Sequence, residues 1–250
     1  MQRYFVKKEQ MTDKVVHILG EDVKHISKVM RMDVGDEVIC SNNHSRTVKC
    51  RLSNLSDKEI IADIIETLDP KTELPVKVTI AQGLPKGDKL DLIIQKGTEL
   101  GAFAFLPFSA ARSIVKWDQK KAGKKIERLE KIAKEAAEQS YRERIPEVLN
   151  VHSFTDLKQK ISSYDVVILA YEESAKRGEQ VQLAQQLASV TLGQKVLVII
   201  GPEGGITEEE LGQLTEQGAI ACGFGPRILR TETASLYVLA AISYHFELMR

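Results

Sequence analysis

The sequence has little cysteine and no long apolar run. Its three cysteines, Cys40, Cys50 and Cys222, form no CxxC pair, so the sequence excludes a disulfide-rich scaffold, and we expect no metal site. The longest apolar runs, 196–200 and 236–242, are far shorter than the ~20 residues that cross a bilayer. The N-terminal segment lacks the apolar region of a secretory signal. We therefore expect a cytoplasmic protein with reduced thiols and no membrane association.

Aromatic residues are also few, at 6% of 250, and neither sign of charge is in excess. With 43% hydrophobic residues the chain is an ordinary globular protein, which excludes intrinsic disorder. The neutral total hides one basic stretch, residues 112–146, which holds 11 Lys and Arg against 6 Asp and Glu. Local positive potential attracts phosphate groups. Lys and Glu also alternate within this stretch at spacings that suit a solvated helix face. Composition does not decide between phosphate binding and a solvated face.

The first 70 residues predict a small β-rich domain. A helix is expected at 21–30, and a polar segment bracketed by Pro70 and Pro75 marks the boundary. We therefore place two domains at 1–70 and 74–250. The expected strands of the first domain cover 15–19, 37–40, 47–52 and 59–67.

The rest of the chain alternates between short apolar strands and helices. This alternation predicts βαβ units and an α/β fold with a largely parallel sheet, covered by helices on both faces. The expected strands cover 76–81, 103–107, 165–170, 196–200 and 219–224. The expected helices cover 89–100, 118–140, 154–161, 181–188, 207–217 and 231–249.

The clearest candidate site is GPEGG, residues 201–205, which follows the expected strand 196–200. Gly201 and Gly204 permit close backbone approach. Glu203 disfavours a phosphate, and the loop lacks both the P-loop lysine and the GxGxxG spacing. A neutral or cationic ligand with hydroxyl groups, such as S-adenosylmethionine, fits better. A plain tight turn is the alternative.

A second candidate is GFGPRILRTETA, residues 223–234, where a strand again ends in a glycine-rich loop before a helix. Thr231 is the expected N-cap of this helix. Arg227 and Arg230 just before it could bind an anion, and Glu232 lies in its first turn. The alternatives are surface salt bridges for the arginines and a favourable interaction with the helix dipole for Glu232.

A third candidate is the segment 169–173, LAYEE, after the expected strand 165–170. Ligands of open α/β sheets bind beyond the carboxyl ends of the strands. If the three strands are neighbours, the three loops therefore converge on one pocket.

A capping box of Thr207 and Glu210 is expected to start the helix after GPEGG.

Together, GPEGG at 201–205 and RILRTETA at 227–234 resemble the RsmE-type ribosomal RNA uridine-N3 methyltransferases of the SPOUT class. A glycine is common in that family where Tyr141 stands here. The likeness extends over most of the chain, to RYF at 3–5, HISKVMRM at 25–32, KGDKLDLIIQKGTELG at 86–101, ARSIVK at 111–116 and EAAEQSYRERIPEV at 135–148.

The resemblance implies a PUA-like β-barrel that helps to bind RNA, followed by a SPOUT α/β domain threaded into a trefoil knot. It implies a homodimer that binds S-adenosylmethionine in the knot loops and makes N3-methyluridine in the 16S RNA of the small ribosomal subunit. The open alternatives are a SPOUT enzyme acting on another RNA, a different α/β enzyme with a nucleotide cofactor, and an RNA-binding module without catalysis.

The resemblance also implies roles for particular residues. Uridine N3 is a poor nucleophile until its proton leaves, so Arg230 is expected to stabilise the uridylate and Glu232 to act as the base or as an orienting group. The residues expected to hold the cofactor are Leu169, Ala170, Ile200, Gly201, Glu203, Gly204, Gly223 and Leu229. Those expected to contact RNA are Arg3, His25, Arg31, Arg112, Lys116 and Arg142.

Overall fold

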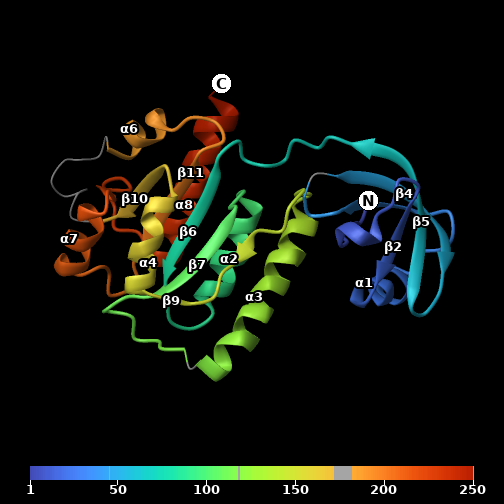
Figure 1. Cartoon of the computed structure of the whole chain (residues 1–250), viewed down its shortest axis with the longest axis horizontal. Helices are drawn as coiled ribbons and strands as arrows, with labels where there is room; N and C mark the ends of the chain where they lie inside the picture. Colours follow the sequence, from blue (N-terminus) through green and yellow to red (C-terminus); the bar gives the residue numbers. More distant parts are fainter. Residues whose placement is uncertain (45, 118, 172–181, 250) are drawn as a thin grey trace. The chain divides into compact units, whose positions relative to one another are not determined.

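The computed structural model describes residues 1–44, 46–117, 119–171 and 182–249. The chain forms two compact units (Figure 1). Unit 1 consists of Met1–Glu73 and Ala137–Ile145, and unit 2 of Leu74–Ala136 and Pro146–Arg250. Among the helices that the structure describes, none combines the length and the apolar character needed to cross a membrane.

Unit 1 is built on a five-stranded sheet in the order β1-β3-β4-β5-β2, in which β1 pairs with β3 in parallel and the other pairs are antiparallel. The four predicted strands are confirmed with small changes at their ends. Strand β1 was not predicted, because three residues that are all buried carry no alternating pattern. The predicted helix forms as α1, Glu21–Lys24, continued by one π-helical turn, His25–Val29. The strands are β1 Arg3–Phe5, β2 Val15–Leu19, β3 Glu37–Ser41, β4 Thr47–Leu55 and β5 Glu59–Leu68.

The segment Ala137–Ile145 belongs to unit 1, although it is remote in the sequence from the rest of it. Arg142, which is 3% exposed, forms an ion pair with Glu73. The Arg3 guanidinium donates to the carbonyl oxygen of Arg142 at 2.7 Å. These contacts fix the segment against both ends of the stretch Met1–Glu73.

Tyr141 lies within this segment and has a φ of +60°, in the left-handed region that favours glycine. The glycine that is common at this position in the resembling family fits the same backbone conformation. Here the tyrosine makes contacts that glycine lacks. Its hydroxyl donates to the carbonyl oxygen of Met1 at 2.8 Å, and the Arg3 guanidinium lies 5.3 Å from its ring centre.

Unit 2 contains a sheet in the order β12-β10-β11-β6-β7-β8, and every pair in it is parallel. The predicted parallel sheet and its five strands are confirmed. The short β8 and β9, which also pair with β7, were not predicted, because two residues carry no periodicity. The strands are β6 Lys77–Gly83, β7 Ala104–Ser109, β8 Glu147–Val148, β9 His152–Ser153, β10 Val166–Ala170, β11 Lys195–Ile200 and β12 Ile220–Cys222.

Helices cover both faces of this sheet, as the sequence predicted. On one face Leu106 of β7 shares a buried cluster with Leu157 and Leu214 from two of the helices. On the other, the ring of Phe105 packs against the backbone of Gly97. The helices are α2 Lys89–Glu99, α3 Gln119–Gln139, α4 Phe154–Lys160, α6 Gln182–Ser189, α7 Glu208–Glu216 and α8 Thr231–Ser243, the last continued by Tyr244–Leu248. Of the predicted positions, Asp118, Glu172, Glu173 and Val181 lie outside the described residues.

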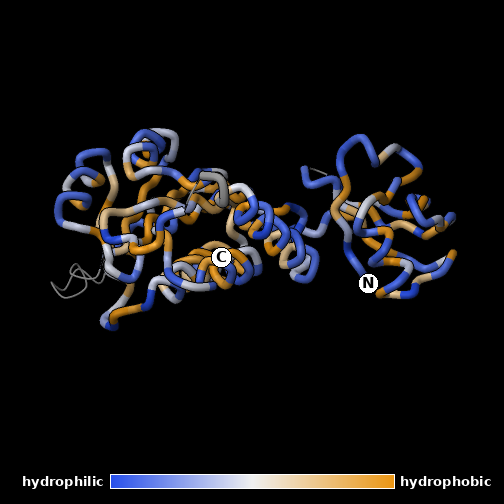
Figure 2. The backbone as a smooth tube through the Cα atoms, turned by 90° about the horizontal axis from the view of Figure 1, so that it is seen from below, coloured by the Kyte–Doolittle hydropathy of each residue, from blue (hydrophilic) through white to orange (hydrophobic). Residues whose placement is uncertain are grey.

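Helix α8 positions the site because it returns across the sheet. It follows the edge strand β12, yet it packs against α2, β6 and β11. Figure 2 shows that the helix leading to the C-terminus is mostly hydrophobic, as a helix packed on a sheet requires. The chain therefore passes over the carboxyl ends of β10 and β11 before α8 begins. The trefoil knot that the resemblance implies stays a prediction.

Candidate active site

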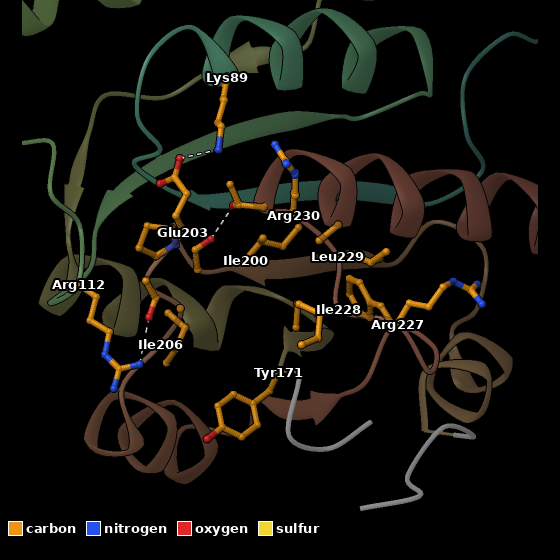
Figure 3. A pocket seen from close by; sticks show the side chains of 18 of the residues that line it. Lys89, Arg112, Tyr171, Ile200, Glu203, Ile206, Arg227, Ile228, Leu229 and Arg230 are labelled. Atoms are coloured by element: carbon orange, nitrogen blue, oxygen red, sulfur yellow. Dashed lines mark hydrogen bonds and ion pairs between the residues drawn. The ribbon is translucent and has the colours of Figure 1, made fainter. Parts of the chain in front are cut away.

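A cavity of about 590 Å³ lies at the carboxyl ends of β10, β11 and β12 (Figure 3). Its volume falls within the ~300–1,000 Å³ of small-molecule sites. The three strands are neighbours in the sheet, so the three candidate loops converge as the sequence suggested. Of the predicted site residues, those that line the cavity are Ala170, Ile200, Gly201, Glu203, Gly204, Leu229, Arg230 and Arg112.

Two residues predicted to hold the cofactor are not part of the cavity wall. The side chain of Leu169 belongs to the apolar cluster between the sheet and α4, where it is fully buried. Gly223 is buried at the end of β12, and the cavity wall begins with the next residue, Phe224. Strand alternation explains Leu169, since adjacent residues of a strand point to opposite faces.

The GPEGG loop is both a tight turn and a wall of the cavity. The Gly205 N–H donates to the Pro202 carbonyl at 2.8 Å, and Gly205 has a φ of +72°. A Cβ at Gly204 would lie 2.8 Å from the Cβ of Arg112, so packing within the protein already requires glycine there. The loop can therefore be a tight turn required by packing and a wall of a ligand-binding cavity at the same time.

The predicted capping box at the start of α7 is confirmed. The Thr207 hydroxyl accepts from the Glu210 N–H at 3.1 Å, and the Glu210 carboxylate accepts from the Thr207 N–H at 3.0 Å. The same carboxylate accepts from the Ala111 N–H at 2.8 Å. Arg112 donates to the Gly204 carbonyl at 3.0 Å. Arg112 thus joins the segment after β7 to the GPEGG loop.

Lys89 in the first turn of α2 was not predicted, yet it is the centre of the charges at the cavity. Its ammonium lies 2.8 Å from Glu203 Oε1 and 3.4 Å from Glu232 Oε2. Burial raises the pKa of Glu203, but the hydrogen bonds from Lys89 and from backbone N–H groups lower it by more. The pKa of Glu203 therefore lies below its ordinary value. One signal could have revealed Lys89. Helix α2 follows β6, whose carboxyl end lies at the same edge of the sheet as the other loops.

Glu232 is close to the cavity without being part of its wall. Its Oε2 atom is buried, and among the described residues it has no hydrogen-bond partner. The ion pair with Lys89 at 3.4 Å offsets part of the desolvation cost of this carboxylate, because an ammonium at that distance still attracts a negative charge. Glu232 therefore retains an oxygen that can accept a proton.

The start of α8 differs from the prediction. Arg230, not Thr231, is the N-cap. The Thr231 hydroxyl donates instead to the Gly201 carbonyl at 2.6 Å and accepts from the amide of Gln82 at 2.8 Å. The Ser235 hydroxyl donates to the other atom of that amide, Gln82 Oε1, at 2.6 Å. Gln82, which the sequence did not single out, therefore links β6, α8 and the GPEGG loop.

The two arginines before α8 both line the cavity and are exposed. In Figure 3 the Arg230 side chain points to the side of the cavity where Lys89 lies, whereas Arg227 points to the opposite end. With Lys89 and Arg112, they give the cavity more positive than negative side chains. Such a cavity attracts an anionic substrate.

The residues predicted to contact RNA divide by exposure. Arg31 and Lys116 are exposed, whereas Arg3 and Arg142 are 4% and 3% exposed and are engaged with unit 1 itself. His25 is half-buried, with Nδ1 3.0 Å from the Tyr4 hydroxyl. A phosphate contact at Arg3 or Arg142 would require these internal pairs to open.

The chain thus combines a β-rich unit with a parallel sheet that has a cavity at its strand ends. Residues 72–243 match the family of RNA methyltransferase domains, and residues 18–65 match the RNA methyltransferase PUA domain. Over 253 aligned residues, which cover 100% of this chain and 99% of the relative, 54% are identical to the ribosomal RNA small subunit methyltransferase E of Bacillus subtilis. The relative from Mycobacterium tuberculosis is 32% identical over 92% of this chain and 87% of its own. The chain belongs to this ribosomal RNA small subunit methyltransferase E family, which confirms the resemblance seen in the sequence.

Solved structures agree with this assignment. The ribosomal RNA small subunit methyltransferase E from Neisseria gonorrhoeae bound to S-adenosyl methionine has a TM-score of 0.84 and 28% identity, covering 97% of both chains. A putative methyltransferase from Legionella pneumophila in complex with the same cofactor has a TM-score of 0.81 and 27% identity, covering 96% of both chains. The predicted α/β fold with a PUA-like domain is confirmed.

Proposed function

We propose that this protein transfers the methyl group of S-adenosylmethionine to N3 of a uridine in the 16S RNA of the small ribosomal subunit. The observation that carries the proposal is the cavity, whose walls are the GPEGG loop and the RILRTETA segment. These are the two segments from which the sequence resemblance to the family was first inferred. The structurally similar relatives named above were solved with this cofactor.

The residues of the cavity suit this cofactor. Ile200, Ile206, Phe224 and Leu229 offer apolar surface for an adenine ring. Backbone groups of the glycine-rich loops are available for hydrogen bonds, and the Glu203 carboxylate suits ribose hydroxyls or a positive charge. Bound there, the cofactor would supply a methyl group that is already activated by a sulfonium.

The chain's own residues would handle the proton and the charge of the uracil. Arg230, at the N-cap of α8, is placed to stabilise the negative charge that develops on the uracil oxygens. Glu232, with an oxygen that accepts no hydrogen bond among the described residues, is the candidate base for the N3 proton. The exposed members of the predicted RNA-contact set, Arg31 and Lys116, would bind phosphates.

The assembly is proposed to be a homodimer. Helix α8 and its extension expose Tyr237, Tyr244 and Leu248, at spacings of seven and four residues. Exposed apolar side chains that recur along one side of a helix are typical of a surface that another molecule covers. We also propose that domain 1–70 binds RNA, that domain 74–250 carries the trefoil knot, and that the enzyme acts in the cytoplasm, where ribosomal RNA is found.

A radiolabelled methyl-transfer assay tests the proposal, on deproteinised 16S RNA and on intact small subunits. We expect labelled N3-methyluridine when the RNA is digested to nucleosides. Label in another nucleoside, or only in another RNA, would show that the enzyme has a different substrate from the one proposed. RNA binding with no transfer to any RNA would leave only a binding module and would refute the proposed activity.

A further inference from the structure

Lys89 is the point at which three separate elements of the site meet. It lies in the first turn of α2, Glu203 lies in the loop after β11, and Glu232 lies in the first turn of α8. Lys89 and Glu203 are separated by 114 residues in the sequence, and their side chains point toward each other in Figure 3. A single ammonium group therefore connects the loop that forms one wall of the cavity to the helix that carries the proposed base.

We propose that Lys89 is a positioning residue of the methyl-transfer site: its ammonium holds the carboxylates of Glu203 and Glu232 in place relative to the cavity. This inference rests on the proposed function, in which Glu203 binds the cofactor and Glu232 accepts the proton. Lys89 differs from Arg230 in its role, since its contacts are with carboxylates of the protein.

The geometry distinguishes the two carboxylates. Glu203 accepts a hydrogen bond from Lys89 at 2.8 Å and a second from the backbone N–H of Lys86 at 3.1 Å, so its orientation is fixed from two sides. Glu232 Oε2 lies at 3.4 Å from the ammonium and has no hydrogen bond in the described part of the chain. The ammonium thus orients Glu203 firmly and lies beside Glu232 without occupying its Oε2 atom with a hydrogen bond.

The charges explain why a lysine is needed there. Without the ammonium, Glu203 and Glu232 would face each other as two like charges at one partly buried place, which favours protonation of one of them. The hydrogen bond to Glu203 raises the pKa of Lys89, so the ammonium keeps its proton at neutral pH. Two other charged side chains line the cavity nearby: Arg230 of α8 points to the side where Lys89 lies, whereas the Arg112 guanidinium is bound to the Gly204 carbonyl.

Lys89→Met and Lys89→Arg test the proposal beside Lys86→Met as the matched control. The side chain of Lys86 is exposed, and only its backbone binds Glu203, so the control removes a neighbouring charge without touching the bridge. Single-turnover methyl transfer is measured across pH. Affinity for the demethylated cofactor is measured by calorimetry, and folding is monitored by the melting temperature.

We expect Lys89→Met to lower the rate at neutral pH by about 10-fold to 100-fold, the scale of a misplaced reacting group. The acidic limb of its pH–rate profile should move to higher pH, because the carboxylates then hold protons more tightly. Lys89→Arg should retain most of the rate, and Lys86→Met should match the wild type. Adding Glu203→Gln to Lys89→Met should return the acidic limb toward its original position, since Glu232 then faces no second charge.

Two results would overturn the inference. One is a Lys89→Met variant with the rate and pH profile of Lys86→Met. The other is a loss of rate that is equal at every pH and that Lys89→Arg does not restore, which would mean that the ammonium acts on the substrate directly. Absence of methyl transfer by the wild type would instead refute the proposed function, and the calorimetric comparison would still report on the link between Lys89 and the cofactor loop.

Discussion

The buried amide of Gln82 allows the contribution of tertiary hydrogen bonds at this site to be measured. Gln82 is 0% exposed. Its nitrogen donates to the Gly83 carbonyl at 3.0 Å and to the Thr231 hydroxyl at 2.8 Å, and its oxygen accepts from Ser235 at 2.6 Å. The perturbation is Gln82→Met, which keeps the length of the side chain and removes all three bonds.

The expected loss follows from what each partner retains. Thr231 keeps its bond to the Gly201 carbonyl, and Ser235 keeps a longer bond of 3.2 Å to the Thr231 carbonyl. At roughly 1 kcal/mol for each of the three lost bonds, Gln82→Met should lower the free energy of unfolding by about 2–3 kcal/mol. A unit of this size then melts about 4–12 °C earlier, as scanning calorimetry would show. Methyl transfer should fall as well, because these bonds hold the start of α8.

A second substitution makes the reasoning sharper. In Gln82→Glu the introduced carboxyl can replace the amide donor only when it is protonated, so burial should raise its folded pKa above the ~4.3 of an exposed glutamate. Its stability relative to the wild type should therefore be highest at low pH and should decline as pH rises through the raised pKa. Gln95→Glu, at an exposed position of α2, is the control. A Gln82→Met variant within about 0.5 kcal/mol of the wild type, or equal pH dependence in the two Glu variants, would refute this reasoning.

Four further predictions concern charged side chains. Arg230→Ala should lower the single-turnover rate by ~10²-fold or more with little change in cofactor affinity, and alkaline pH should partly restore it; loss of rate, affinity and stability together would indicate a structural role. Because the pKa of Glu203 is lowered by folding, its ionised form stabilises unit 2 above its ordinary value of 4.5, and that contribution is lost as pH falls through the lowered pKa. The melting temperatures of wild type and Glu203→Gln should therefore differ at neutral pH and converge in acid; a constant difference would contradict the ion pair. Arg142→Met should destabilise unit 1 by roughly 2 kcal/mol, since Glu73 loses its ion pair and keeps only the backbone N–H groups of Glu143 and Arg144. The exposed Arg31→Glu should instead leave melting unchanged and weaken RNA binding with a flatter salt dependence, measured by filter binding, and the reverse pattern would refute the assignment by exposure.

The agreement between sequence and structure is best where the information is local. Strand β2 has the predicted bounds, Val15–Leu19, because successive residues of this strand alternate between buried and more exposed positions. The capping box at Thr207 and Glu210 formed as expected, since both partners lie within one helical turn. Even so, the Glu210 carboxylate has a second partner in Ala111, 99 residues away, that no local pattern reveals.

The prediction of Thr231 as an N-cap failed for a related reason. Threonine before a helix is a common cap, but the hydroxyl of Thr231 is used by the Gly201 carbonyl and by Gln82. A side chain has few donors and acceptors, so a buried tertiary partner competes directly with a local one. Arg230 therefore occupies the N-cap position, although its side chain makes no capping hydrogen bond.

The sequence by itself determined the longer elements of both units, the parallel sheet, and the loops that hold the candidate site, because periodicity, glycine and capping residues act over a few positions. Only the tertiary structure decided that β12 lies beside β10, that α8 returns over β6 and β11, and that Lys89 joins Glu203 to Glu232. It also decided that Arg3 and Arg142 are buried while Arg31 is exposed. The physical reason is distance along the chain: Gln82 and Thr231 are 149 residues apart, and which polar groups meet depends on how the apolar faces of strands and helices pack.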